Sequence, residues 1–180
     1  MAIYFITGNS NKFQEVKTIL PEIEQMDVDL PEIQDIDAKV VIRAKLIEAL
    51  NHRNAELVVE DTSLYFECLN GLPGPLIKWF MKTIGNEGLF DIASRYGNFN
   101  AEARTIVGYA RTSEEIYFFD GSVKGTVVSP QGVSGFGWDP IFQPYGYSRS
   151  LAQMSKDEKN QISSRRIALD RLSEFLKSYR

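Results

Sequence analysis

Cysteine and histidine are nearly absent from this chain of 180 residues, which contains only Cys68 and His52. A single cysteine excludes an intrachain disulfide and is typical of a reducing compartment, so we expect a cytoplasmic protein. A Ser-His-Asp or Cys-His mechanism would need His52, which lies in the polar, turn-like run Asn51–Asn54. We interpret His52 as a solvated residue at a helix end and expect neither mechanism.

Long apolar runs and clustered positive charge are also missing. No segment of the sequence approaches the roughly 20 apolar residues of a membrane-spanning helix, and the first residues lack the basic stretch that opens a signal peptide. The net charge is −4 and the pI is about 5.1, whereas proteins that bind duplex nucleic acid usually carry clustered positive charge. We therefore expect neither a membrane nor a nucleic acid as partner, although a local group of lysines and arginines can still bind one small anion.

Apolar residues make up 43% of the chain, enough for a single domain over residues 1–180 with a substantial core. Runs rich in β-branched and aromatic residues predict strands at 2–6, 57–59, 64–69, 101–110, 116–119 and 122–128, with a weaker one at 26–30. Apolar residues at helical spacing predict helices over 13–20, 40–47, 77–84, 88–94 and 168–176. This pattern predicts an α/β fold in which the last strands form an antiparallel meander.

The first predicted strand is followed by a polar turn, Thr7–Lys12, with the sequence Thr-Gly-Asn-Ser-Asn-Lys. Such a turn points backbone N–H groups and a helix N-terminus at whatever lies above it, which favours a phosphate. It is not a Walker A loop, because that motif needs a second glycine followed by Lys and Ser or Thr. An ordinary helix cap made by Asn9 or Ser10 explains the same residues.

Two adjacent carboxylates, Glu60 and Asp61, follow the β-branched run 57–59. Carboxylates at the end of a buried strand are costly unless they are paired or bind a metal, and ligands of α/β proteins lie beyond the carboxyl ends of strands. Magnesium is usually held by one or two carboxylates together with substrate phosphates and water. These residues therefore point to a Mg²⁺ site, and a solvated acidic turn is the alternative.

A glycine-rich segment with two large aromatic residues, Gly135–Pro140, is the clearest sign of a ligand site. Glycine lets the backbone come close to a ligand, and the rings of Phe136 and Trp138 can stack on a planar base. Lys159 and Arg165 follow, and such cations are natural partners of phosphate oxygens. The combination predicts a site for a nucleotide; a turn with a packed tryptophan is the alternative.

Together these motifs resemble the inosine triphosphate pyrophosphatase (Ham1-like) family. The matching runs are Thr-Gly-Asn-x-x-Lys at 7–12, Glu-Asp-Thr at 60–62, Gly-Leu-Pro-Gly-Pro-x-Ile-Lys-Trp-Phe at 71–80, Gly-Phe-Gly-Trp-Asp-Pro at 135–140, Glu-Lys-Asn at 158–160 and Ser-x-Arg at 163–165. They occur in the family's order and cover nearly the whole chain. The resemblance implies an elongated mixed β-sheet flanked by helices, two lobes with a central active-site cleft, and a homodimer.

The resemblance also implies an enzyme, a nucleoside triphosphate diphosphatase. Its reaction would be the hydrolysis of non-standard purine nucleoside triphosphates (ITP, dITP and XTP) to the monophosphate and pyrophosphate, which removes them from the nucleotide pool. Asp61 would take the proton from the attacking water, and Lys12 would polarise the triphosphate. Mg²⁺ would be held by Glu32, Glu60 and Asp61. The implied substrate-binding residues are Thr7, Gly8, Asn9, Lys12, Lys45, Thr62, Phe136, Gly137, Trp138, Asp139, Lys159, Ser164 and Arg165.

The chain departs from the family at Ser164, where the family has a histidine near the base. Serine keeps a hydroxyl, but it is shorter and cannot be cationic. We therefore expect the chemistry to survive and the discrimination against ATP to be altered, unless Arg165 or backbone amides supply it.

Three other functions stay open. A nucleotide-binding sensor without turnover would use the same cleft, but it would not need the carboxylates Glu32, Glu60 and Asp61. A single-stranded nucleic-acid binder would stack bases on Phe136 and Trp138, which the acidic pI disfavours. A Maf-like pyrophosphatase would carry out the same reaction with a different base preference, and substrate profiling separates it.

Overall fold

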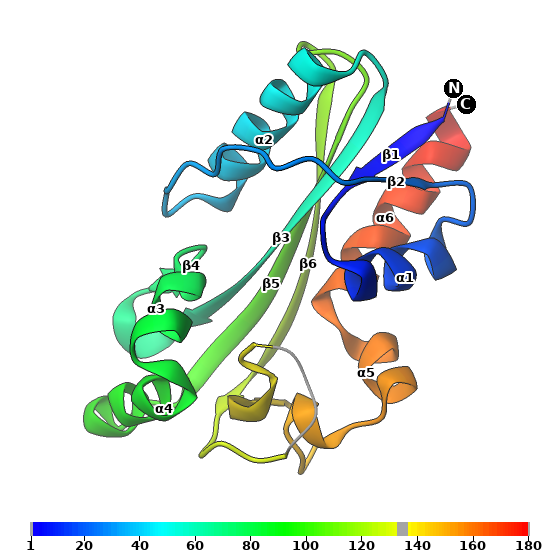
Figure 1. The fold of residues 1–180 in the computed structure, drawn as a ribbon. Helices are drawn as coiled ribbons and strands as arrows, with labels where there is room; N and C mark the ends of the chain where they lie inside the picture. Colours follow the sequence, from blue (N-terminus) through cyan, green and yellow to red (C-terminus); the bar gives the residue numbers. More distant parts are fainter. Residues whose placement is uncertain (1, 133–136, 180) are drawn as a thin grey trace.

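The protein is built on a mixed β-sheet, seen in a computed structural model that describes residues 2–132 and 137–179 (Figure 1). The seven strands are β1 (Ile3–Ile6), β2 (Glu24–Met26), β3 (Glu56–Phe66), β4 (Pro73–Gly74), β5 (Asn100–Ala110), β6 (Ile116–Val127) and β7 (Phe142–Pro144). Their order is β2-β1-β3-β5-β6-β7, and β4 pairs with the far end of β3. β1 runs parallel to β2 and β3, and the remaining pairs are antiparallel.

Helices cover both faces of this sheet. They are α1 (Ser10–Ile19), α2 (Ala38–His52), α3 (Ile77–Thr83), α4 (Gly85–Tyr96), α5 (Lys156–Ile162) and α6 (Ser164–Tyr179). α2 lies on one face, while α1 and α6 lie on the other (Figure 1). Across the described ranges, no helix combines the length and the apolar character needed to cross a bilayer. The predicted α/β fold, a mixed sheet flanked by helices, is confirmed.

The central strand β3 sends its side chains alternately to the two faces. Val58 packs into a core with α1 and α6, whereas Leu57 and Val59 pack into a separate core beneath α2. All three are buried. The alternation continues along the strand, so the adjacent carboxylates Glu60 and Asp61 point to opposite faces of the sheet.

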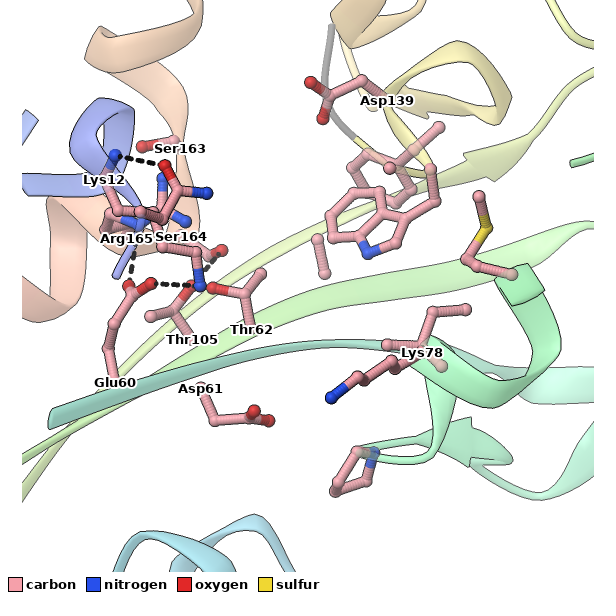
Figure 2. Close-up of a pocket in the computed structure, with 18 of the residues that line it drawn as sticks. Lys12, Glu60, Asp61, Thr62, Lys78, Thr105, Asp139, Ser163, Ser164 and Arg165 are labelled. Carbon is pink, nitrogen blue, oxygen red and sulfur yellow. Dashed lines mark hydrogen bonds and ion pairs between the residues drawn. The ribbon is translucent and has the colours of Figure 1, made fainter. Parts of the chain in front are cut away.

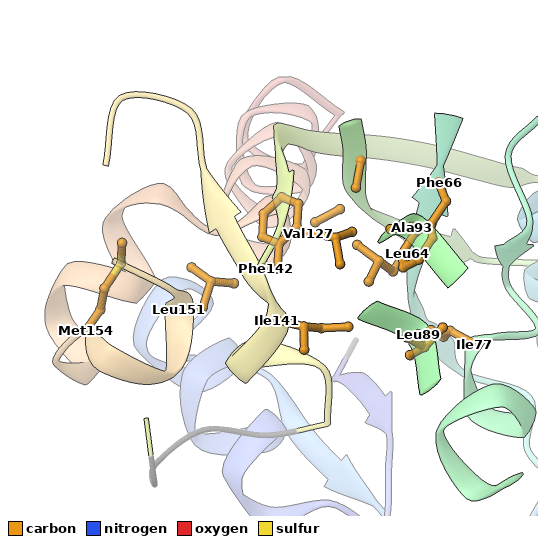
Figure 3. Close-up of a cluster of buried hydrophobic side chains, with 12 residues drawn as sticks. Leu64, Phe66, Ile77, Leu89, Ala93, Val127, Ile141, Phe142, Leu151 and Met154 are labelled. Carbon is orange, nitrogen blue, oxygen red and sulfur yellow. The ribbon is translucent and has the colours of Figure 1, made fainter. Parts of the chain in front are cut away.

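A third core fills the other end of the sheet (Figure 3). It joins the far half of β3 to α3, α4 and β7 through buried side chains that include Leu64, Phe66, Ile77, Leu89 and Phe142. The two ends of the sheet therefore have separate hydrophobic cores. The polar residues of β3 lie between them.

Glycine lets α2 rest directly on the sheet. Gly108 of β5 lies under this helix, where an added Cβ would come 2.3 Å from Ile42 Cγ2 and 2.8 Å from Leu46 Cδ1. Both of these side chains are fully buried, so a larger residue at this position would push the helix away. The close contact fixes the helix that carries Lys45.

Three predicted strand boundaries were wrong. The sequence pattern predicts two strands at 57–59 and 64–69, but β3 continues through Glu60–Ser63. It also predicts a break after residue 119, but β6 continues through Asp120 and Gly121. The second strand lies at 24–26 instead of 26–30. In the first two cases polar residues look like turn formers, yet ladder pairing with β5 keeps the strand extended.

Candidate active site

A cavity of about 490 Å³ lies beside β3 (Figure 2). β1 pairs with residues 56–58 and β4 pairs with residues 64–65, so in the described sheet the stretch between them has no strand on that side. A ligand at this open edge can reach both faces of β3, and hence both Glu60 and Asp61. Residues of five helices (α1, α2, α3, α5 and α6), of the strands β5, β6 and β7, and of the loops at 32–35 and 137–139 also line the cavity.

Most of the residues predicted from the sequence line this cavity. They are Asn9, Lys12, Glu32, Lys45, Glu60, Asp61, Thr62, Gly137, Trp138, Asp139, Lys159, Ser164 and Arg165. Thr7 and Gly8 are described but are not among the lining residues. Phe136 lies outside the described residues.

The turn before α1 is held by side-chain hydrogen bonds. Thr7 Oγ1 accepts a hydrogen bond from the N–H of Asn9 at 3.1 Å. Asn9 Oδ1 accepts hydrogen bonds from the N–H groups of Asn11 (3.0 Å) and Lys12 (3.1 Å). Asn9 is therefore the N-cap of α1, a role that the sequence left open between Asn9 and Ser10. The cap fixes the start of the helix that carries Lys12.

Glu60 is a buried carboxylate that holds two cations. Lys12 Nζ lies 2.8 Å from its Oε1, an ion pair without good hydrogen-bond geometry, and Arg165 Nε donates to its Oε2 at 2.7 Å. Arg165 also donates to Glu15 of α1. Burial would raise the pKa of Glu60, but Arg165 and Lys12 outweigh it and lower the pKa to about 2. Glu60 is therefore ionised at neutral pH and fixes both cations beside the cavity.

Asp61 lies on the opposite face of β3, the face covered by α2. Ser63 Oγ donates a hydrogen bond to its Oδ2 at 2.9 Å. Burial raises the pKa of Asp61 above its usual value, although Lys45, Ser63 and Lys12 act in the opposite direction. A raised pKa makes this carboxylate a stronger base than an exposed one, so Asp61 is well suited to take a proton from water.

Glu32 precedes α2 and accepts hydrogen bonds from two lysines. Lys45 of α2 donates to Oε1, and Lys78 of α3 donates to Oε2 at 3.0 Å. Burial would raise the pKa of Glu32, but Lys45 and Lys78 outweigh it and lower the pKa. Lys45 also attracts Asp61, so one lysine interacts with two carboxylates of the cavity. Lys78 lies within the matching run 71–80 but was not among the predicted site residues.

Another part of the cavity is aromatic. Trp138 packs edge-on against Phe142, with the ring centroids 5.6 Å apart. Asp139 is only 3% exposed and lies 2.5 Å from Lys159 Nζ. Figure 2 shows Asp139 across the cavity from Arg165. The cavity is therefore amphipathic, with cations around β3 and an aromatic wall opposite.

Ser164 begins α6 and directs its hydroxyl at the sheet. Its Oγ lies 2.8 Å from Thr105 Oγ1, which in turn lies 2.9 Å from Thr62 Oγ1. Ser164 and Thr105 are both buried. The three hydroxyls form a chain from β3 through β5 to α6. Thr105 was not predicted as a site residue, because a single polar residue within an apolar strand forms no recognisable motif.

A metal ion at this site would need ligands from outside the protein. Across residues 2–132 and 137–179, no three His, Cys, Asp or Glu side chains gather closely enough to hold one. Mg²⁺ commonly takes one or two carboxylates and completes its coordination with phosphate oxygens and water. Glu32 and Asp61, which share Lys45 as a neighbour, fit an ion that arrives with a phosphorylated ligand.

This chain is similar to known proteins in both sequence and structure. A model of the Ham1 family matches residues 3–175. An inosine triphosphate pyrophosphatase from Schizosaccharomyces pombe is 40% identical over 181 residues, which cover 98% of this chain and 96% of the relative. The solved structure of the Staphylococcus aureus Ham1 protein is similar with a TM-score of 0.88 and 25% identity, over the full length of both chains. A nucleoside-triphosphatase, or dITP/XTP pyrophosphatase, from Mycobacterium abscessus has a TM-score of 0.75 and 26% identity, over 96% of this chain and 98% of that one.

Proposed function

Since this chain belongs to the Ham1 family, we propose that it is a nucleoside triphosphate pyrophosphatase. It hydrolyses the non-standard purine nucleotides ITP, dITP and XTP to the monophosphate and pyrophosphate. This reaction removes such nucleotides from the pool before polymerases use them. The observation that carries the proposal is the amphipathic cavity, in which the half-buried carboxylate of Asp61 lies close to fixed cations and across from an aromatic wall.

Hydrolysis at the α-phosphorus needs an activated water and a stabilised phosphate charge. Asp61 takes the proton from the attacking water, because burial raises its pKa. Lys12 and Arg165, both held by Glu60, bind and polarise the triphosphate. Cations that are already fixed need little reorganisation as charge develops in the transition state, and this lowers the barrier.

The base occupies the aromatic side of the cavity. Trp138 and Asp139 form the base pocket, and Phe136 stacks on the purine. Lys159, which pairs with Asp139, lies close enough to this pocket to contact the substrate. The remaining substrate contacts come from Asn9, whose N–H is held by Thr7, from Lys45, Thr62 and Gly137, and from Ser164 at the start of α6.

Glu32 and Asp61 would hold Mg²⁺. The ion would supply positive charge that offsets the charge of the triphosphate. Glu60, which the sequence resemblance adds to the metal ligands, contacts Lys12 and Arg165 on the other face of β3. We therefore assign Glu60 the role of orienting these two cations.

The function is tested by pyrophosphate release with Mg²⁺ from ITP, XTP, dITP, ATP, GTP and a set of pyrimidine triphosphates. We expect strong release from ITP, XTP and dITP only. Equal turnover of ATP or GTP would keep the chemistry and overturn the selectivity. A preference for pyrimidine triphosphates would favour the Maf-like alternative, and binding of ITP without any release would favour a sensor.

Replacing Ser164 with histidine is expected to raise the ITP:ATP ratio of kcat/KM. The Ser164 hydroxyl is engaged by Thr105, whereas a longer donor could reach the 6-oxo group of the base. A donor left unmatched by the amino group of adenine costs about 1–3 kcal/mol, or a factor of about 5–150. Steady-state kinetics of Ser164→His and Ser164→Ala check this, because the alanine variant adds no donor. An unchanged ratio in the histidine variant would show that selectivity is read elsewhere.

We also propose that the protein is a cytoplasmic homodimer. The single cysteine, Cys68, supports a reducing compartment. Large apolar side chains exposed near α3, among them Ile33, Trp79 and Ile84, support a second copy of the chain as partner. Light scattering of the purified protein tests the dimer, and a mass of 20.4 kDa would contradict it.

A further inference from the structure

A row of small and polar residues crosses the middle of the sheet. Thr62 of β3 is paired with Thr105 of β5, and Thr105 is paired with Gly121 of β6. The next row on the same face of the sheet, in which Val107 is paired with Phe119, belongs to the core beneath α6. The Thr-Thr-Gly row therefore lies where that core ends and the cavity begins.

Gly121 lets the first turn of α6 touch the backbone of the sheet. An added Cβ would come 2.0 Å from the carbonyl oxygen of Ser164 and 2.7 Å from the backbone nitrogen of Ala168. Both of these atoms belong to helix backbone, which cannot move aside as a side-chain end can. Any residue larger than glycine at position 121 must displace the start of α6.

The hydroxyl chain fixes the same turn in a second way. Thr105 Oγ1 lies 2.8 Å from Ser164 Oγ and 2.9 Å from Thr62 Oγ1, and Thr105 is fully buried. Hydrogen bonds are directional, so this contact sets the rotation of α6 about its axis as well as its distance from the sheet.

The sequence of α6 matches this arrangement. Its buried residues at four-residue spacing are Ser164, Ala168, Leu172 and Leu176, small at the end that meets Gly121 and large farther along. The residue that follows Ser164 is Arg165, whose guanidinium reaches both Glu60 and Glu15. The position of Ser164 on the sheet therefore determines where the guanidinium of Arg165 lies.

We propose that Gly121 and Thr105 are positioning residues that dock the start of α6 on the sheet and so place Arg165 for the triphosphate. Neither side chain needs to touch the reacting atoms. The inference rests on the proposed function, because it assumes that Arg165 contacts the substrate.

The first test is Gly121→Ala. We expect KM for ITP to rise at least about tenfold, a change that corresponds to about 1.4 kcal/mol of lost binding. The matched control is Gly88→Ala in α4, where an added Cβ would come 2.5 Å from Ile84 Cβ, away from the residues that line the cavity. This control also introduces a clash, with a side chain instead of a helix backbone, and should leave KM unchanged. An unchanged KM in a folded Gly121→Ala protein would overturn the proposal.

The second test separates the hydroxyl from the size of the side chain. Thr105→Ser keeps the hydroxyl and should keep KM near the wild-type value, whereas Thr105→Val keeps the size, loses the hydroxyl and should raise KM. If both variants behave alike, Thr105 fills space and does not position α6.

The third test asks whether these residues act through Arg165. In a double-mutant cycle, Gly121→Ala should add little to the KM of Arg165→Ala, whereas simple additivity of the two effects would overturn the proposal. The Nε–H signal of Arg165 in ¹⁵N NMR, assigned with Arg165→Lys, should shift in Gly121→Ala and stay in place in Gly88→Ala. This signal does not depend on turnover. A wild-type protein that releases no pyrophosphate would therefore contradict the proposed function. In that case the NMR result would still show whether Gly121 positions Arg165.

Discussion

Asp61→Asn is expected to lower kcat for ITP by about 10²–10⁴-fold, the contribution typical of a positioned general base. Asparagine has nearly the same shape and keeps an oxygen that can accept the hydrogen bond from Ser63. It cannot take a proton from water. The loss should therefore appear in kcat, measured as pyrophosphate release with saturating ITP and Mg²⁺. Wild-type kcat in the variant would assign the base to another group.

The same substitution is expected to stabilise the fold at neutral pH. The folded-state pKa of Asp61 is raised above its usual value of 3.8, so protonation favours the folded state. That contribution is complete below about pH 3.8 and is lost as the pH rises through the folded-state pKa. Asparagine avoids the cost of the buried charge, and Tm should rise by about 2–4 °C for each kcal/mol gained.

Thermal unfolding at several pH values checks the sign of this effect. The difference in Tm between Asp61→Asn and the wild type should be largest near neutral pH and should shrink as Asp61 becomes protonated. Asp91→Asn, which changes an exposed carboxylate on α4, should alter neither kcat nor Tm. A lower Tm for Asp61→Asn at neutral pH would show that the attraction of Lys45 outweighs burial. Loss of activity together with a gain in stability would mark Asp61 as a residue kept for function.

Local pattern was enough to predict an α/β fold with an antiparallel meander, because β-branched runs and helical spacing are properties of short segments. The mixed sheet was predicted only from the resemblance to a known family. It was not enough for β3. The polar stretch Glu60–Ser63 looks like a turn, yet it stays extended because all of its residues pair with β5 across the sheet. Glu60 can stay buried there because it meets Lys12 and Arg165, which are far from it in the sequence. Contacts between residues so far apart in the sequence cannot be predicted from the pattern of a single segment.

The site shows the same limit. Adjacent carboxylates suggest one metal site, but the alternation of a strand sends Glu60 and Asp61 to different faces, and this follows only when the strand is known to be continuous. Thr105 was missed because one polar residue looks ordinary in an apolar strand, and Lys78 was missed because nothing within the run 71–80 sets it apart as a site residue. They become part of the site only where α3 and β5 meet the cavity. The order of the motifs predicted which segments meet at the cavity. What each side chain contacts depends on how the strands and helices are arranged around it.

Glu60→Gln is expected to destabilise the fold by about 3 kcal/mol, at the lower end of the range for removing one partner of a buried ion pair. Lys12 and Arg165 would lose their shared carboxylate. The cost stays at the lower end because Arg165 keeps Glu15 and Lys12 is partly exposed to water. For a chain of this length the loss corresponds to about 6–12 °C in Tm. Asp170→Asn, which breaks the half-exposed pair with Arg166, is the matched control and should cost less than about 1 kcal/mol.

The pH dependence of this loss separates an ion-pair effect from a packing effect. The folded-state pKa of Glu60 is about 2, below its usual value of 4.5, so the ionised carboxylate favours the folded state. Its contribution is complete above about pH 4.5 and is lost as the pH falls from there towards about 2. The difference in unfolding free energy between wild type and Glu60→Gln should therefore be constant near neutral pH and should disappear across this acid window. A difference that persists at about pH 2 would mean that glutamine disturbs packing, and that the charge of Glu60 does not hold Lys12 and Arg165 in place.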